Sequence, residues 1–236
     1  DHYLQQTGAI AQVDEDEAAM VAAAMDPAHD IDGLAGIGGA QLATTVGAFE
    51  SHRGLKASER RLVNNSPMPN PVEVDVAFLP RDAGDLSGSV AVVLDVLRAT
   101  SSIVTMLDRG VRSIGLAESV DAARLGAKGI PGALLCGEVG GLPPYGFDFG
   151  NSPLEFSRLD LAGKDMVMAT TNGTNAVRAC AGASAVFIGA LLNANAVVRE
   201  ALELARVAGR LTFVCSGRGG RFVLDDAVAV GYLCHI

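Results

Sequence analysis

The sequence predicts an α/β fold of three layers, α/β/α, built around a mostly parallel sheet. Two observations indicate this class. Ala, Val, Leu and Gly dominate the 236 residues, of which 49% are hydrophobic and 5% aromatic, a composition that suits close packing of helices on a buried sheet. From residue 72 onward, short apolar runs alternate with helical stretches of about ten residues, as in right-handed β-α-β units.

Each element of this regular part follows from its local pattern. Short runs rich in apolar and β-branched residues predict strands at 72–79, 90–96, 111–117, 133–136, 166–170, 185–188 and 211–215. The stretches between the strands predict helices at 99–108, 120–128, 174–180 and 194–208, with a last apolar helix from residue 224. A loop rich in Gly and Pro, 137–153, interrupts the alternation.

Residues 1–73 differ from the rest of the chain. Up to residue 74 the chain holds 11 acidic and 4 basic side chains, and an Ala-rich stretch at 18–25 predicts one short helix. Three prolines between residues 67 and 71 exclude both a helix and a central strand, so this stretch is interpreted as a linker. We therefore expect one α/β domain, 74–236, preceded by an acidic segment.

The composition also disfavours several partners. With 18 Lys and Arg against 27 Asp and Glu, the net charge is −9, which disfavours binding to nucleic acid. A small anionic substrate would need local positive charge or a metal. No apolar run reaches the roughly 18 residues of a membrane span, and the first residues show no signal-peptide pattern. We therefore expect a cytoplasmic protein that does not bind membranes.

Four cysteines lie far apart in the chain, without a Cys-x-x-Cys pair: Cys136, Cys180, Cys215 and Cys234. This spacing favours buried thiols in a reducing compartment over a zinc site or a set of disulfides.

The turn after the strand at 90–96 is the first candidate site, because ligands of open α/β sheets bind beyond the carboxyl ends of the strands. It carries Asp95 and Arg98, followed by the hydroxyls of Thr100 and Ser101. A carboxylate at the tip of a buried strand is costly unless it meets a metal, a cation or a catalytic task. The start of the next helix favours an anion. The alternative is a helix cap beside a structural arginine.

The second candidate is the loop 137–153. Glycines flank Glu138 and allow the backbone to approach a ligand, and Glu138 with Asp148 offers oxygen ligands to a hard cation. Asn151 and Ser152 follow in the same loop. The alternative is a flexible surface loop in which these two residues form a turn.

The third candidate is the turn from Thr170 to Thr174, which follows a strand and opens a helix. Its hydroxyls, the Asn172 amide and the permissive Gly173 suit a phosphate or a sulfonate. An ordinary helix cap needs only one such residue.

The fourth candidate is the Gly-rich turn that carries Arg218 and Arg221, which are able to clamp oxyanions. Asp225 and Asp226 follow at the start of the last helix. One of them is assigned to a metal, and the alternative is that they complement the helix dipole.

Several familiar motifs are absent. The sequence has no phosphate-binding loop of the G-x-x-x-x-G-K-[ST] type and no G-x-S-x-G elbow, and its four histidines lie outside the four turns. A serine–histidine hydrolase is therefore disfavoured. The residues that follow Asp95 form no Asp-x-Asp pair, which disfavours a haloacid-dehalogenase-type phosphatase.

Taken together, six blocks of the sequence resemble the 2-phosphosulfolactate phosphatase (ComB) family in order and spacing, over residues from about 74 to 236. The blocks are 95–101, 137–141, 146–153, 170–174, Asn193 after Gly189, and 217–226. The resemblance implies a magnesium-dependent acid phosphatase that hydrolyses 2-phospho-3-sulfolactate to sulfolactate and phosphate, a step toward coenzyme M.

The resemblance also leads to a set of expected roles. We expect one Mg²⁺ on the carboxylates of Asp95, Glu138 and Asp226. Asp95, Arg98 and Glu138 form the expected catalytic set, and Asp95 acts either as a nucleophile or by orienting water. Arg98 and the turn 171–174 are expected to hold the phosphate. The expected substrate contacts are Thr100, Ser101, Asn151, Ser152, Thr171, Asn172, Gly173, Thr174 and Asn193, with Arg218 and Arg221 on the sulfonate and carboxylate.

The sequence departs from the family pattern at three points. Val139 stands where a polar residue is expected, residues 1–73 do not match the start of the family, and the chain is expected to stop early, at Ile236. Two alternatives therefore stay open: a non-catalytic anion-binding or scaffold protein, and a phosphatase for another 2-phospho acid. Strand edges left exposed by a missing part predict homo-oligomerisation.

Overall fold

The computed structural model describes residues 20–22 and 71–236. Most of the acidic segment and of the predicted linker therefore lies outside the described residues, and the domain boundary near residue 74 stays a prediction. The prediction of a helix at 18–25 is wrong for residues 20–22, the part of it that the structure describes, because they form a strand. Strand β1 (Met20–Ala22) lies there and pairs in parallel with β7 (Ala185–Gly189), whose edge offers unpaired backbone groups.

The predicted α/β class is confirmed, and every ladder between the described strands is parallel. The larger sheet has the order β1-β7-β3-β8-β2. Its remaining strands are β2 (Glu73–Ala77), β3 (Ser89–Leu94) and β8 (Arg210–Cys215). Strand β3 lies in the middle and all six of its residues are buried, as its apolar sequence predicts.

Three strands form a second sheet instead of joining the first. They are β4 (Ser113–Ala117), β5 (Leu134–Gly137) and β6 (Asp165–Ala169), in the order β4-β6-β5. The predicted strands thus divide between two sheets, whereas the sequence predicted one sheet in three layers. Helix α1 (Ala99–Asp108) packs between the two sheets, and its apolar side chains enter one core cluster with residues of both.

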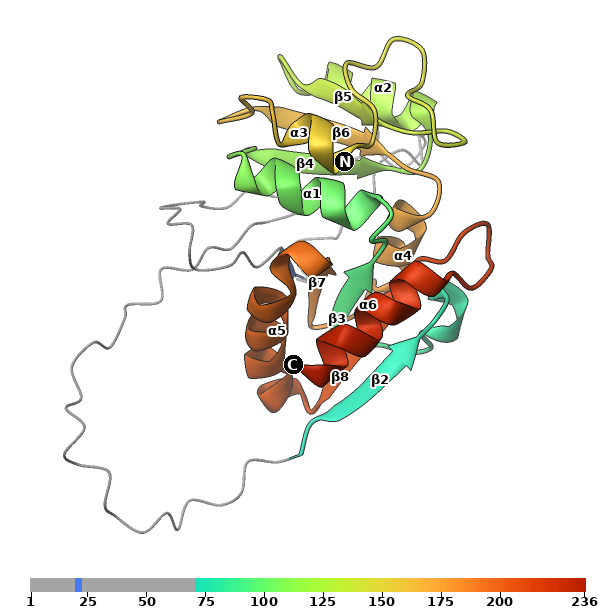
Figure 1. The fold of residues 1–236 in the computed structure, drawn as a ribbon, viewed down its shortest axis with the longest axis vertical. Coiled ribbons are helices and arrows are strands. Elements are labelled where there is room, and N and C mark those ends of the chain that lie inside the picture. The colour runs from blue at the N-terminus through green and yellow to red at the C-terminus, as the bar shows by residue number, and fades with distance from the viewer. Residues whose placement is uncertain (1–19, 23–70) are drawn as a thin grey trace, which may run out of the picture.

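Helices lie between the sheets and on their outer faces (Figure 1). The outer face of the larger sheet is covered by α5 (Ala194–Ala208) and α6 (Leu224–His235), and its inner face by α1 and α4 (Gly173–Ala179). Helix α2 (Val120–Lys128) covers the outer face of the smaller sheet. The order of layers is therefore helix, sheet, helix, sheet, helix.

The predicted helices 99–108, 120–128 and 194–208 are confirmed at both ends. Three short elements were not predicted: η1 (Pro80–Asp82), α3 (Pro153–Phe156) and η2 (Leu191–Asn193). In the part of the chain that the structure describes, no helix is both long and apolar enough to span a membrane.

The cysteines are unpaired thiols. Cys136, Cys180 and Cys215 are buried and Cys234 is exposed, so burial is confirmed for three of the four. Burial raises the pKa of the Cys180 thiol to about 12, which keeps it protonated and unreactive.

Candidate active site

The four predicted turns meet at the carboxyl ends of β3, β5, β6 and β8, and hydrogen bonds join them. Thr171, after β6, donates its N–H and its hydroxyl to Glu138 after β5, over 3.1 and 3.0 Å. The N–H of Gly219, after β8, donates to the Asn172 side chain over 3.0 Å. The turn after β3 is joined to α6, because the Val96 N–H donates to Asp226 over 3.0 Å.

Asp95 is the buried carboxylate at the centre of these turns. It follows β3 directly and is 8% exposed. Burial and the neighbouring charge of Asp226 raise the pKa of Asp95 to about 6, against partial compensation by the Ala99 N–H and the Ser216 hydroxyl. A carboxylate with this environment at a cluster of loops is typical of a functional site.

Gly173 allows the turn after β6 to approach Asp95. A Cβ atom at this position would lie 2.9 Å from Asp95 Oδ2 and 2.9 Å from the Ala99 methyl carbon, which is closer than real Cβ contacts. Gly173, predicted as a substrate contact, thus also allows α4 to pack closely against the Asp95 turn.

Asp226 lies beside Asp95 and is 1% exposed. Its Oδ1 accepts the Val96 N–H, and its Oδ2 accepts the Ser216 hydroxyl and the Gly217 N–H, both over 3.2 Å. Burial raises its pKa although these donors lower it. Asp226 therefore connects the turns after β3 and β8, beyond any role with a ligand.

Glu138 is half-buried and has donors on both oxygens. Oε2 accepts the Gly141 N–H over 2.7 Å and Oε1 accepts from Thr171. Burial raises its pKa, but these donors and the nearby Arg98 guanidinium bring the pKa of Glu138 below its ordinary value. Arg98 itself donates to the Gly141 carbonyl over 3.1 Å, so Glu138 and Arg98 hold the same loop.

The structure does not assemble the expected three-carboxylate metal set. Among residues 71–236, no three His, Cys, Asp or Glu side chains gather closely enough to hold a metal ion. Asp95 and Asp226 lie together, while Glu138 is bound to the loop 138–141 and to Thr171.

Several expected substrate contacts have local structural roles. The Thr100 hydroxyl accepts the Asp95 N–H, and the Ser101 hydroxyl donates to the Val96 carbonyl, so both stabilise their own turn. Ser152 caps α3 by accepting the Glu155 N–H.

Three further residues on the expected substrate list are buried: Thr174, Asn193 and Asn151. The Thr174 hydroxyl donates to the Ala117 carbonyl, and the Asn193 amide bonds to Ala190 and Ile188 in the turn after β7. Asn151 differs, since its Oδ1 is buried without a hydrogen-bond partner within the described part of the chain. The Asn151 Oδ1 atom is therefore able to accept a hydrogen bond from a ligand or a water molecule.

Arg218 and Arg221 are both exposed. They form a tight turn in which the Arg218 N–H donates to the Arg221 carbonyl over 2.9 Å and the Arg221 N–H donates to the Arg218 carbonyl over 3.0 Å. Gly219, between the two arginines, contacts Asn172 through its backbone N–H.

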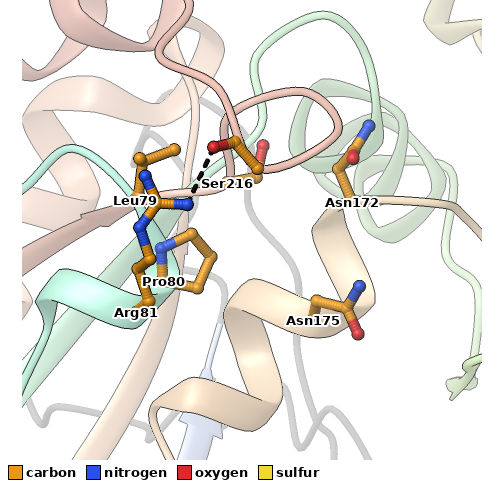
Figure 2. A pocket seen from close by; sticks show the side chains of 7 residues that line it. Leu79, Pro80, Arg81, Asn172, Asn175 and Ser216 are labelled. Carbon is orange, nitrogen blue, oxygen red and sulfur yellow. Dashed lines mark hydrogen bonds between the residues drawn. The ribbon is translucent and has the colours of Figure 1, made fainter.

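Arg81 and Asn175 were not among the predicted site residues. Both line a cavity of about 180 Å³ with Leu79, Pro80, Asn172, Ser216 and Gly220 (Figure 2). The signal was present, because Arg81 follows β2 and the carboxyl ends of parallel strands share one edge of a sheet.

Comparison with known proteins finds one family over most of the described chain. The family model described as 2-phosphosulpholactate phosphatase matches residues 78–236, which include all four turns.

Individual relatives agree. The chain is 46% identical over 147 residues to a probable 2-phosphosulfolactate phosphatase of Deinococcus radiodurans. It is 38% identical over 165 residues to that of Carboxydothermus hydrogenoformans and 40% identical over 156 residues to that of Clostridium perfringens strain SM101. These matches cover 62, 70 and 64% of this chain, and 60, 67 and 62% of the three relatives. The chain therefore spans about two thirds or less of the length of the curated relatives it matches.

Proposed function

Since the chain belongs to the 2-phosphosulfolactate phosphatase family, we propose that it hydrolyses 2-phospho-3-sulfolactate to sulfolactate and phosphate. The observation that carries the proposal is the buried pair of Asp95 and Asp226 at the point where four turns meet. We further propose that the reaction depends on Mg²⁺ and takes place in the cytoplasm as a step toward coenzyme M.

The Asp95–Asp226 pair supports the metal proposal. Mg²⁺ binds through one or two carboxylates, the substrate phosphate and several waters, so two carboxylates are sufficient. Burial and repulsion from Asp226 raise the pKa of Asp95, and a bound divalent cation would relieve this repulsion. When bound, Mg²⁺ would neutralise charge on the phosphate. Glu138, whose oxygens are occupied by backbone and hydroxyl donors, is proposed to position the loop instead.

The remaining residues supply position and charge, which dominate catalysis of phosphoryl transfer. The Arg98 guanidinium donates to the Gly141 carbonyl and lies near the charge of Glu138, and we propose that it holds the phosphate. Asp95 acts in one of two ways: as a nucleophile that forms an aspartyl phosphate, or by orienting water. A hydroxylamine-sensitive phosphoenzyme that is absent in Asp95→Asn would identify the nucleophile.

The test is phosphate release from 2-phospho-3-sulfolactate, with Mg²⁺ and with EDTA. We expect Asp95→Asn to lower kcat by roughly 10³-fold or more, because the central carboxylate is lost. Asp121→Asn is the matched control, since Asp121 is a 93% exposed carboxylate on α2 and should leave the rate unchanged.

Folded protein that releases no phosphate under these conditions would contradict the proposed function. Binding of the substrate without turnover would then favour a non-catalytic anion-binding protein. Equal rates on 2-phospholactate and 2-phosphosulfolactate would instead favour a phosphatase for other 2-phospho acids.

A further inference from the structure

A small cavity lies beside the Asp95–Asp226 pair, and of its described lining residues only Asn172 was among the predicted substrate contacts. Three chain segments line it: Leu79, Pro80 and Arg81 after β2, Asn172 and Asn175 at the start of α4, and Ser216 and Gly220 after β8. Its volume of about 180 Å³ is below the roughly 300 Å³ at which pockets for larger ligands begin. The cavity therefore suits a small group.

Arg81 is held at the cavity by a contact with the turn after β8. Its Nη1 donates to the Gly220 carbonyl over 2.9 Å. A guanidinium has five N–H donors in a planar fork, so this bond orients the group and leaves donors for a ligand. Figure 2 shows Arg81 on one side of the cavity and the amides of Asn172 and Asn175 on the other.

The charge of the lining favours an anion. Of the described residues that line the cavity, Arg81 is the only charged one, and the rest of its polar lining consists of two amides, a hydroxyl and backbone groups. Asp82, on the same short helix, approaches Arg81 only to 3.8 Å and is half-exposed, which makes a weak pair. A guanidinium with neutral hydrogen-bonding groups matches the oxygens of a sulfonate or carboxylate.

The cavity adjoins the carboxylate pair through Ser216. This residue lines the cavity, and its hydroxyl donates to Asp226 Oδ2 over 3.2 Å and faces Asp95. A small substrate whose phosphate lies at Asp95 would therefore place its second anionic group in the cavity. Arg218 and Arg221, to which the sequence analysis gave this group, are not among the lining residues.

We propose that Arg81 determines which 2-phospho acid the site accepts. Its guanidinium holds the sulfonate of the substrate, while the phosphate lies at Asp95. This inference rests on the proposed function, since it names the part of the same substrate that each side of the site binds.

The test compares wild type with Arg81→Gln on two substrates, 2-phospho-3-sulfolactate and 2-phospholactate, which lacks the sulfonate. We expect Arg81→Gln to raise KM for the first at least tenfold, with kcat and the KM for 2-phospholactate changed less than twofold. Arg124→Gln is the matched control, because Arg124 is a half-exposed arginine on α2 that contacts Asp121 and the Tyr145 carbonyl.

A calorimetric titration with sulfoacetate, which needs no turnover, separates this inference from the proposed function. We expect wild type and Arg124→Gln to bind sulfoacetate, and Arg81→Gln to bind it at least tenfold more weakly. If no variant turns over but this difference is found, the cavity assignment holds and the phosphatase function fails. If Arg81→Gln affects both substrates equally, the cavity holds a group that both substrates share, the phosphate or the carboxylate, and the proposal is overturned. It is also overturned if Arg81→Gln leaves both KM values and sulfoacetate binding unchanged.

Discussion

The pKa values of Asp95 and Glu138 shift in opposite directions, although both residues follow a strand directly. Asp95 is buried beside Asp226, and its pKa is raised to about 6. Glu138 has donors on both oxygens, and its pKa lies below the ordinary value. The surroundings of each carboxylate therefore decide its pKa. The ionised form is unfavourable at Asp95, where a cation would stabilise it, and favourable at Glu138.

Asp95 is therefore expected to destabilise the fold when it is ionised. Its ordinary pKa is 3.8, so the native protein binds this proton more tightly than the unfolded chain does, and the free energy of unfolding falls as the pH rises from 3.8 through 6. In EDTA at pH 7.5, Asp95→Asn should unfold with a free energy about 1–3 kcal/mol higher than wild type. At pH 4 this gain should be absent. Urea unfolding at the two pH values measures both differences.

Asp121→Asn serves again as the control and should show the same small difference from wild type at both pH values. If Asp95→Asn were less stable than wild type at pH 7.5, burial and repulsion would not be the dominant influences on this carboxylate.

At the scale of elements, helices 99–108, 120–128 and 194–208 were predictable because their apolar periodicity and their ends are local. Ser119 caps α2 by accepting the Ala122 N–H, and Gly209 ends α5 with φ at +91°. The short elements η1 and α3 escaped prediction because three or four residues carry no periodicity.

The amino ends of β4 and β6 are joined by an ion pair that sequence reasoning did not predict. Asp165 is 6% exposed, and Arg112 donates to it through two nitrogens, Nε over 2.9 Å and Nη2 more closely. The Ser113 hydroxyl donates to the same carboxylate over 2.6 Å. The hydrogen bond from Arg112 is the main reason that the pKa of Asp165 lies below its ordinary value.

This pair predicts a pH-dependent loss in Asp165→Asn. A carboxylate with a lowered pKa stabilises the fold above its unfolded pKa, and this stabilisation disappears as the pH falls through the native pKa. We expect Asp165→Asn to lower the free energy of unfolding by about 1–2 kcal/mol at pH 7 and by much less near pH 3. Urea unfolding at both pH values tests this, and a loss that is equal at both would show that the charge is not involved.

At the scale of the whole molecule, one core cluster joins the two sheets. It contains Val93 and Ile188 from the larger sheet, Ile114 and Met168 from the smaller sheet, and Met106 from α1 between them. The two sheets share no hydrogen-bonded strand pair among the described residues, so this cluster is the main apolar connection between them.

We expect truncation of this cluster to weaken both sheets together. Met106 is fully buried, and Met106→Ala should cost about 2–5 kcal/mol through lost contacts and the cavity left behind. Hydrogen exchange should show equal loss of amide protection in β3, β8 and β6. Loss confined to one sheet would mean that the two sheets unfold independently.

The sequence by itself determined the α/β class, nearly all strand and helix positions, and the four turns that meet at the candidate site. These features depend on local composition and on the rule that ligands bind at the carboxyl ends of strands. Only the tertiary structure decided that the strands divide between two sheets, that Asp226 lies beside Asp95 while Glu138 supports a loop, and that Arg81 faces the cavity. Those outcomes depend on contacts between residues distant in the chain, such as Arg81 with Gly220 and Val96 with Asp226, and local patterns carry no information about such pairs.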